Sequence, residues 1–325
     1  TGVQTCALPI CPVLARLIRN RDVVGDEAID RYLNGGVDQL YAPRLLPDMD
    51  KAVGILEEKI SQGAPIRIVG DYDIDGVCST CILFLGLRRL GNTKNLGLKA
   101  LIQANQLDPG KISVYHIGFV TGPCLNAGGR LQTAKLALAL LLAKDQKEAW
   151  ELAAELKALN DQRKDMTQQG VDEAAAQVEQ LYMNDKVLVI FLPDCHESLA
   201  GIVAGSIRER YNKPVFVLTH SEEGAKGSGR SIEAYHMFHG LVEVQDLLSK
   251  FGGHPMAAGF SLPLEHVEEF RRRLNENARL TEEDFIPKVW IDIAQPFENV
   301  GEELIGELER LEPFGQGNEK PQFAL

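Results

Sequence analysis

The residue types with the clearest chemistry are three aspartates at alternate positions, Asp71, Asp73 and Asp75. Three carboxylates within five residues repel one another unless solvent or a cation screens them. Hard divalent cations such as Mg²⁺ and Mn²⁺ prefer oxygen ligands. The pattern also opens an EF-hand loop, but the twelfth position of that loop is Ile82 rather than glutamate. We therefore expect a divalent-metal site here, with an acidic surface turn as the alternative.

Three further segments carry residue types that bind phosphate. The run Gly227-Ser228-Gly229-Arg230 predicts a glycine-rich loop at 224–229, in which backbone N–H groups and an arginine grip an anion. Gly252-Gly253-His254 places a histidine behind two glycines. His196 lies between a predicted strand and the start of a predicted helix, a position that attracts anions. The alternatives are a plain turn, a structural histidine and, for His196, a zinc ligand.

The elements that position these residues differ between the two halves. Residues 66–69 predict a buried strand directly before the aspartates, and 77–90 predict a helix. That helix carries Cys78 and Cys81, a C-x-x-C pair interpreted as core thiols. Residues 98–143 predict helices broken by a loop at 122–130. Residues 145–183 predict one or two amphipathic connecting helices with a solvated face.

The second half alternates between strand and helix patterns and predicts a self-sufficient α/β domain. The first half shows one convincing strand, and a lone strand cannot form a sheet. Two apolar stripes before it, within 12–62, predict helices. The elements expected in the second half are strands at 187–192, 215–219, 256–262 and 289–293 and helices at 199–210, 233–250 and 264–279.

Composition sets the limits on these expectations. The chain has 325 residues, of which 45% are hydrophobic and 25% charged, as in an ordinary globular protein. A formal net charge of −12 argues against coating nucleic acid through bulk positive charge. The longest apolar run, 136–143, is far below the roughly 18 residues of a membrane span. The six scattered cysteines favour a reducing cytoplasm.

Several motifs together resemble one known superfamily. IRIVGDYDIDGVCST resembles the first motif of the DHH phosphoesterases, and CHESLAGIVAGSIRERYNKPVFVLT, KGSGRSIEAYHMF and FGGHPMAAGFSL resemble the DHHA1 domain of its RecJ family. GPCLNAGGRLQTAKLAL and LEPFGQGNEKPQF are also similar to that family. The resemblance covers about residues 12–325. It implies two α/β domains joined by a long connecting helix.

The resemblance also implies an activity and a set of site residues. The family hydrolyses single-stranded DNA from its 5′ end with Mn²⁺ or Mg²⁺, which makes single-stranded DNA the expected partner. Asp73 and Asp75 match catalytic metal ligands, and Asp71 supports them. Asn126 and Arg130 match a DNA-facing loop. The DNA- and phosphate-binding residues expected in the second domain are His196, Ser228, Gly229, Arg230, Gly252, Gly253 and His254.

The sequence also departs from the family pattern. It contains no Asp-His-His triplet, and in relatives the strand-rich bulk of the first domain lies between Gly91 and Asn92. We therefore expect an internal deletion, which accounts for the lone strand, and a chain of impaired activity. The alternatives are a non-catalytic remnant that binds single-stranded nucleic acid or phosphate, and a phosphodiesterase of oligonucleotides or cyclic dinucleotides.

The expected organisation follows from these motifs. It comprises a non-native leader (1–11), an incomplete DHH-like domain (12–144), a connecting helix (145–185), a DHHA1-like domain (186–295) and the start of a truncated oligonucleotide-binding region (296–325). No association with a membrane is expected.

Overall fold

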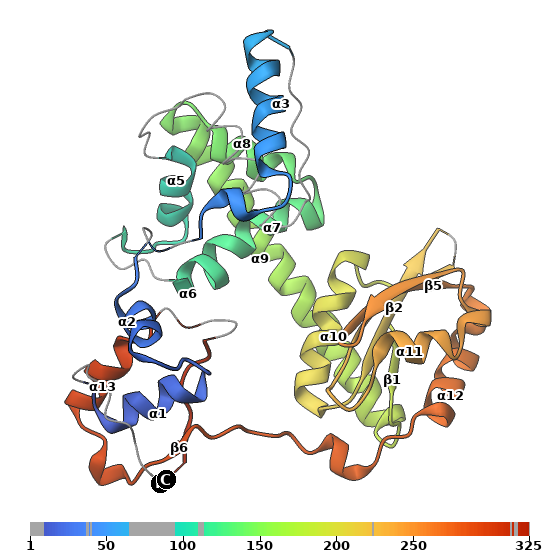
Figure 1. Ribbon diagram of the computed structural model, residues 1–325. Helices are drawn as coiled ribbons and strands as arrows, with labels where there is room; N and C mark the ends of the chain where they lie inside the picture. Colours follow the sequence, from blue (N-terminus) through green and yellow to red (C-terminus); the bar gives the residue numbers. More distant parts are fainter. Residues whose placement is uncertain are drawn as a thin grey trace. The chain divides into compact units, whose positions relative to one another are not determined.

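The computed structural model describes residues 10–36, 39, 41–64, 95–109, 114–222, 224–312, 314 and 318–324. The predicted strand at 66–69, the three aspartates and the C-x-x-C pair lie outside these residues. Contacts divide the chain into two compact units, one formed by Thr1–Arg67 with Lys288–Leu325 and the other by Ile68–Pro287 (Figure 1). Within the described ranges, no helix is both long and apolar enough to cross a membrane.

The first unit combines the two ends of the chain. Its core gathers Leu14, Leu17 and Ile18 from the first helix with Leu311, so the first apolar stripe predicted a packed face correctly. Strands β6 and β7 pair in parallel. The elements of this unit are α1 (Pro12–Asn20), α2 (Asp26–Asn34), η2 (Pro43–Leu45), α3 (Met49–Ser61), β6 (Ile293–Ala294), η9 (Phe297–Asn299), α13 (Glu302–Glu309) and β7 (Phe323–Ala324).

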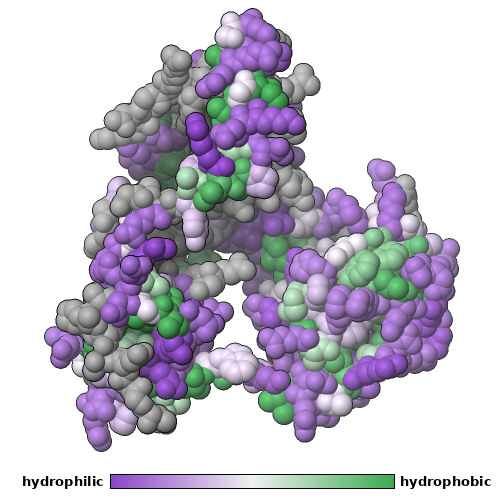
Figure 2. Space-filling model, viewed as in Figure 1, coloured by the Kyte–Doolittle hydropathy of each residue, from purple (hydrophilic) through white to green (hydrophobic). Residues whose placement is uncertain are grey.

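Helix α3 has no buried residue, as is also true of α2 and α13. The second apolar stripe in the sequence predicted a helix here, which is confirmed, but Val53 and Ile60 of that stripe are 40% and 49% exposed. Figure 2 shows hydrophobic surface over this helix among hydrophilic side chains. Periodicity therefore predicted the helix correctly, whereas its burial depends on what lies against it.

The second unit begins with a group of helices packed on one long helix. α9 runs without a break from Gln146 to Gln177, and its first turn is capped by Asp145, which accepts a hydrogen bond from the Glu148 N–H at 2.9 Å. The helical prediction for this stretch is thus confirmed, and of the two alternatives, one helix or two, the structure has one long helix followed by a π-helical turn. The helices around it are α5 (Leu96–Ala104), α6 (Val114–His116), α7 (Gly122–Leu131) and α8 (Lys135–Leu142), with π-helical turns at Ile117–Thr121 and Val178–Tyr182.

Residues 122–130 form most of a helix, α7, so the expected loop is wrong. Three glycines favour a loop on propensity alone, but Gly122, Cys124, Leu125, Ala127 and Gly128 are buried on this helix. Gly128 lets α7 approach α9, because a Cβ there would lie 2.9 Å from Leu156 Cδ2. Tertiary packing of small residues therefore decides the helical conformation.

A five-stranded sheet forms the rest of the second unit, in the order β1-β2-β3-β5-β4. β1 pairs with β2 in parallel and all other pairs are antiparallel. The strands are β1 (Leu188–Phe191), β2 (Val215–Ser221), β3 (Gly224–Arg230), β4 (Lys250–His254) and β5 (Ala257–Leu262). The helices are α10 (Glu197–Tyr211), α11 (Met237–Val242) and α12 (Val267–Asn277), with 3₁₀ turns at Gln245–Leu247, Leu264–His266 and Glu282–Phe285.

The two faces of this sheet are covered differently. On one face, Phe216 and Phe260 pack with Phe270 of α12 around ring centroids 5.0–5.5 Å apart. On the other face, Leu188, Ile190, Val215 and Val217 pack against α9 and α10. These two helices thus cover the part of the face formed by β1 and β2. The same face continues over β3, β5 and β4, and this part carries the candidate functional residues.

Several predictions in the second half need correction. The expected glycine-rich loop at 224–229 is the central strand β3, and the expected helix at 233–250 is the short α11 followed by a 3₁₀ turn. Strand β4, which contains Gly252, Gly253 and His254, was not predicted. The expected strand at 289–293 reduces to the two residues of β6. Glycines disfavour a strand on propensity, but here they make room for the aromatic core.

Candidate nucleic-acid interface

The strand register brings three of the predicted site residues to one face of the sheet. Arg230 pairs with Ala257, which pairs with His254. Ser228 pairs with Gly259, which pairs with Gly252. Residues directly opposite one another on neighbouring strands point to the same side, so Ser228, Arg230 and His254 share the face that α10 partly covers.

Between these side chains, no described residue covers the face. A Cβ added at Gly252 or at Gly259 would meet no atom of the described residues within 4 Å, and both glycines and His254 are exposed. Neighbouring strands lie about 4.8 Å apart, so the strip from Ser228 to Gly252 is about 10 Å wide. An extended polymer could therefore lie directly on the backbone here.

Gly227 and Gly229 have a different role from the predicted one. Their Cα atoms face the aromatic core, where added Cβ atoms would come within 2.3 Å of Phe260 Cζ and 2.5 Å of Met237 Sδ, respectively. β3 is paired on both sides, with β2 and β5. A loop of free N–H groups around Gly229 is therefore not present, and the phosphate contact predicted for this glycine has no support from the geometry.

Gly253 likewise lies in a crowded position. An added Cβ would lie 2.7 Å from Ala258 Cα, so close packing between β4 and β5 accounts for this glycine. Its exposed neighbour Gly252 has open space above it. Of the three glycines predicted to contact phosphate, Gly229, Gly252 and Gly253, only Gly252 borders the exposed strip.

Two arginines from distant parts of the chain meet on the first turns of α10. The Arg230 guanidinium lies against Gly201, where a Cβ would be 2.7 Å from its Nη2. Arg130, on α7, donates from Nη1 to the carbonyl oxygen of Ser198 at 2.9 Å. The structure thus brings together Arg130 and Arg230, which are 100 residues apart in the sequence.

A third arginine, which the sequence did not single out, belongs to this group. Arg163 on α9 is half-buried, and its Nε donates to Asn160 Oδ1 at 3.1 Å. Burial, and next the charge of Arg130, hold the pKa of Arg163 below its usual value. Arg163 lies in a charged stretch of a long helix, where an arginine is common. The one feature of the sequence that could have indicated its burial is its spacing from Leu156 and Asn160, which places the three on one helix face.

Arg130, Arg163 and Arg230, which we call the arginine cluster, pair with no carboxylate of the described residues. Among the residues that the structure describes, no carboxylate oxygen lies within 4.0 Å of these guanidinium groups. Burial, followed by the charges of Arg130 and Arg208, lowers the pKa of Arg230. Half-buried like charges without counter-ions are costly, and an anion placed among them would be held strongly.

Asn126 lies on α7, one helical turn before Arg130. Its Oδ1 is buried and has no hydrogen-bond partner among the described residues. An orphaned buried acceptor costs stability, so this amide is a candidate for contact with a bound molecule that donates a hydrogen bond. The predicted DNA-facing role of Asn126 stays a prediction.

His196 caps α10 rather than leaving its N-terminus open. Its Nδ1 accepts from the Ser198 N–H at 3.3 Å and lies 2.8 Å from Ser198 Oγ. The next residue, Glu197, pairs with Lys226 of β3 at 2.9 Å. His196 is exposed beside Ser198, whose carbonyl oxygen accepts from Arg130, so its predicted DNA contact is sterically open but untested.

The expected metal ligands Asp71, Asp73 and Asp75 lie outside the described residues. Within the ranges that are described, no group of three or more histidine, cysteine, aspartate or glutamate side chains could hold a metal ion. A zinc site around His196 therefore finds no support there. The donor set of the three aspartates, all carboxylate oxygens, suits Mg²⁺ or Mn²⁺ by its chemistry.

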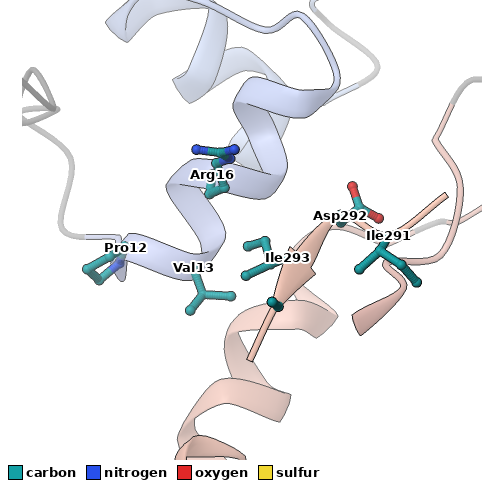
Figure 3. Close-up of a pocket in the computed structure, with 7 residues that line it drawn as sticks. Pro12, Val13, Arg16, Ile291, Asp292 and Ile293 are labelled. Atoms are coloured by element: carbon teal, nitrogen blue, oxygen red, sulfur yellow. The ribbon is translucent and has the colours of Figure 1, made fainter. Parts of the chain in front are cut away.

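A separate hollow lies in the first unit, between α1 and the strand segment at 291–294 (Figure 3). Its lining is mostly apolar, with Arg16 and Asp292 as its charged side chains. Figure 3 shows Val13 and Ile293 facing each other across it. Nothing in this lining resembles a reactive group, so we assign it no chemistry.

The five-stranded sheet with Ser228, Arg230 and His254 on one face belongs to a DHHA1 domain, whose family model matches residues 184–279. The RecJ OB domain model matches residues 291–325. The single-stranded-DNA-specific exonuclease RecJ of Bacillus subtilis is 43% identical over 281 residues, covering 84% of this chain and 35% of that protein. The chain belongs to the RecJ family.

Solved structures agree with this assignment at the level of fold. RecJ from Thermus thermophilus in complex with Mg²⁺ superimposes with a TM-score of 0.84 at 24% identity, covering 98% of this chain and 64% of the other. Its complex with Mn²⁺ also gives a TM-score of 0.84, at 22% identity, with 98% and 66% covered. The chain spans about a third of the length of the curated relatives it matches, 35% of the Bacillus subtilis protein.

Proposed function

We propose that this chain binds single-stranded DNA on the open face of the DHHA1 sheet and hydrolyses it from the 5′ end with divalent metal ions. The arginine cluster carries the proposal. Its cations have no carboxylate partner among the described residues and lie next to a strip of exposed glycine backbone, and both features suit a phosphodiester chain. Membership of the RecJ family supports the choice of single-stranded DNA. We include a cytoplasmic location in this proposal.

The described side chains have distinct tasks in binding. The guanidinium of Arg230 offers a planar fork of donors to a phosphate, and the Ser228 hydroxyl, two residues away on the same face, offers one more. His254 stands at the far side of the glycine strip and can donate from its ring. The strip is about 10 Å wide, and Gly252 and Gly259 form its surface. It would therefore accept an extended single strand of DNA more readily than the wider double helix.

Asp73 and Asp75, with Asp71 beside them, would hold the metal ions. A bound divalent ion supplies Lewis-acid stabilisation of the charge that develops on the scissile phosphate. The arginine cluster would orient that phosphate, and positioning of this kind supplies a large share of a hydrolytic rate enhancement. The chain has no Asp-His-His triplet, so we propose that it hydrolyses DNA more slowly than a relative with the full set of ligands.

A non-catalytic DNA-binding protein is the second candidate. The observation that favours it is that no carboxylate of the described residues acts on the charges of Arg163 and Arg230. Binding would then need no metal, and affinity would fall with salt by about 0.7 log units per log unit of salt for each phosphate contact. A phosphodiesterase of oligonucleotides or cyclic dinucleotides would instead favour short substrates.

The test uses the full chain, 5′-labelled single-stranded DNA and Mn²⁺. We expect slow release of mononucleotides that Asp73→Ala abolishes and that a blunt duplex does not show. Salt-sensitive binding without any release would favour the non-catalytic candidate. Faster cleavage of dinucleotides than of long strands would favour the third activity. Equal release by the wild type and by Asp73→Ala would contradict a metal site at the aspartates.

A further inference from the structure

We propose that Arg163 of α9 is a further phosphate-binding residue and that Asn160 positions its guanidinium. The inference rests on the proposed function and extends it to the connecting helix, whose sequence predicts a solvated helix with one packed face. If it holds, the long helix contributes directly to the DNA interface as well as joining the two parts of the second unit.

The first support is the position of Arg163 on α9. Leu156, Asn160 and Arg163 are spaced by four and three residues and therefore lie on one face of the helix. Leu156 packs against Gly128 of α7, two residues before Arg130. The face of α9 that carries Arg163 is thus the face that meets the helix of Arg130.

The second support is the way the guanidinium is held. Its Nε donates to Asn160 Oδ1 at 3.1 Å, and Asn160 is only 2% exposed. Among the described residues, neither Nη group of Arg163 has a hydrogen-bond or ion-pair partner. A buried amide therefore anchors one edge of the guanidinium fork, and none of the described residues occupies its other donors, as a site for an oxygen-rich anion requires.

The third support is electrostatic. Arg163 and Arg130 are close enough for the charge of Arg130 to lower the pKa of the Arg163 guanidinium, in addition to the effect of burial. Holding two cations together in a half-buried site costs free energy. A phosphate of the DNA backbone, placed between them, would remove that cost, so the chemistry selects an anion with several acceptor oxygens.

The experiment measures binding of a fluorescein-labelled oligo(dT) to the full chain in EDTA, by anisotropy across a salt series. We expect Arg163→Gln to weaken binding about tenfold at low salt and to reduce the salt slope by about 0.7. The matched control is Arg272→Gln, which removes the same charge from an exposed arginine already paired with Glu269 and Glu276. We expect this control to bind like the wild type.

A double-mutant cycle tests the positioning role of Asn160. Asn160→Ala should weaken DNA binding in the wild type but should have no further effect in the Arg163→Gln background. If Asn160 were purely structural, Asn160→Ala would weaken binding by the same factor in both backgrounds. Thermal unfolding of every variant monitors folding, and Arg163→Lys, which keeps the charge but loses the fork, should retain the salt slope and lose affinity.

Two results overturn the inference in different ways. If Arg230→Gln weakens binding but Arg163→Gln matches Arg272→Gln, Arg163 is not a phosphate contact and the proposed function stands. If the wild type shows no salt-sensitive binding of oligo(dT), the proposed function fails as well.

Discussion

Arg130 on α7 donates to the carbonyl oxygen of Ser198 in the first turn of α10, 68 residues further along the chain, at 2.9 Å. This bond joins the helical part of the second unit to the sheet part at the point where Arg230 also rests on α10. The arginine cluster is therefore made by tertiary contacts between elements that have no local sequence relationship. Its charges are the basis of the first prediction.

Replacing Arg230 by methionine should weaken DNA binding and stabilise the free protein. The guanidinium lies half-buried near Arg130 and Arg208, and burial, followed by these two charges, lowers its pKa, so removing the charge relieves both costs. We expect about tenfold weaker binding of single-stranded DNA and a Tm higher by about 2 °C at low salt. Anisotropy and calorimetry measure the two effects. A Tm that falls together with affinity would show that Arg230 is mainly structural.

Substitution of Gly259 by valine should block the DNA-binding face without harming the fold. Its Cβ would meet nothing within 4 Å, and valine favours strands. We expect an unchanged or higher Tm together with weaker binding of oligo(dT). Gly227→Val is the control, because its Cβ would collide with Phe260, at a cost of about 1–3 kcal/mol. Full DNA affinity in Gly259→Val would remove this strip from the interface.

Stability should fall at alkaline pH in a way that depends on Cys124. Burial raises the pKa of this thiol, although a hydrogen bond from Asn105 opposes the effect. An unfolded cysteine titrates near about 8.5, so above that pH the unfolded state loses the proton first and unfolding is favoured. The loss reaches up to about 1.4 kcal/mol per pH unit until the folded thiol also titrates.

Urea unfolding at pH values of about 7.5 and about 9.5, on either side of the unfolded thiol's pKa, checks this expectation. Cys124→Ala should be less stable at both values, because it leaves a small cavity, but should lose less stability between them than the wild type. Cys195, whose pKa burial also raises, provides a second variant for comparison. An identical loss in the wild type and in Cys124→Ala would show that this thiol does not contribute.

Arg271 ties α12 to the segment that follows α9, the π-helical turn Val178–Tyr182 and Asp185, and this contact should matter for stability. Arg271 makes two hydrogen bonds to Asp185, at 2.7 and 3.1 Å, and its Cζ lies 4.1 Å from the centroid of the Tyr182 ring. Arg271→Lys loses the fork and much of the stacking, at a cost of about 1–2 kcal/mol. Urea unfolding measures it, with Arg272→Lys on the exposed face as the control. Equal stabilities of the two variants would contradict this role.

Local sequence patterns predicted some elements well. The stripe of Leu14, Leu17 and Ile18 predicted a packed helix, and the long amphipathic stretch from 145 predicted α9, because side-chain periodicity is a property of the segment itself. The same logic failed at β3 and α7, where glycines suggested loops. There, the aromatic core above Gly227 and the close approach of α9 to Gly128 decide the backbone conformation, and neither neighbour is close in sequence.

The sequence by itself determined the family, the residue types of the site and the chemistry expected of a carboxylate turn, since motifs of fixed spacing carry that information. It also pointed to Ser228, Arg230 and His254 as candidates. Only the tertiary structure decided that these three share one face, that Gly252 and Gly259 leave it bare, and that Arg163 joins Arg130. Strand register and helix packing set those distances, and both arise from contacts between segments far apart along the chain.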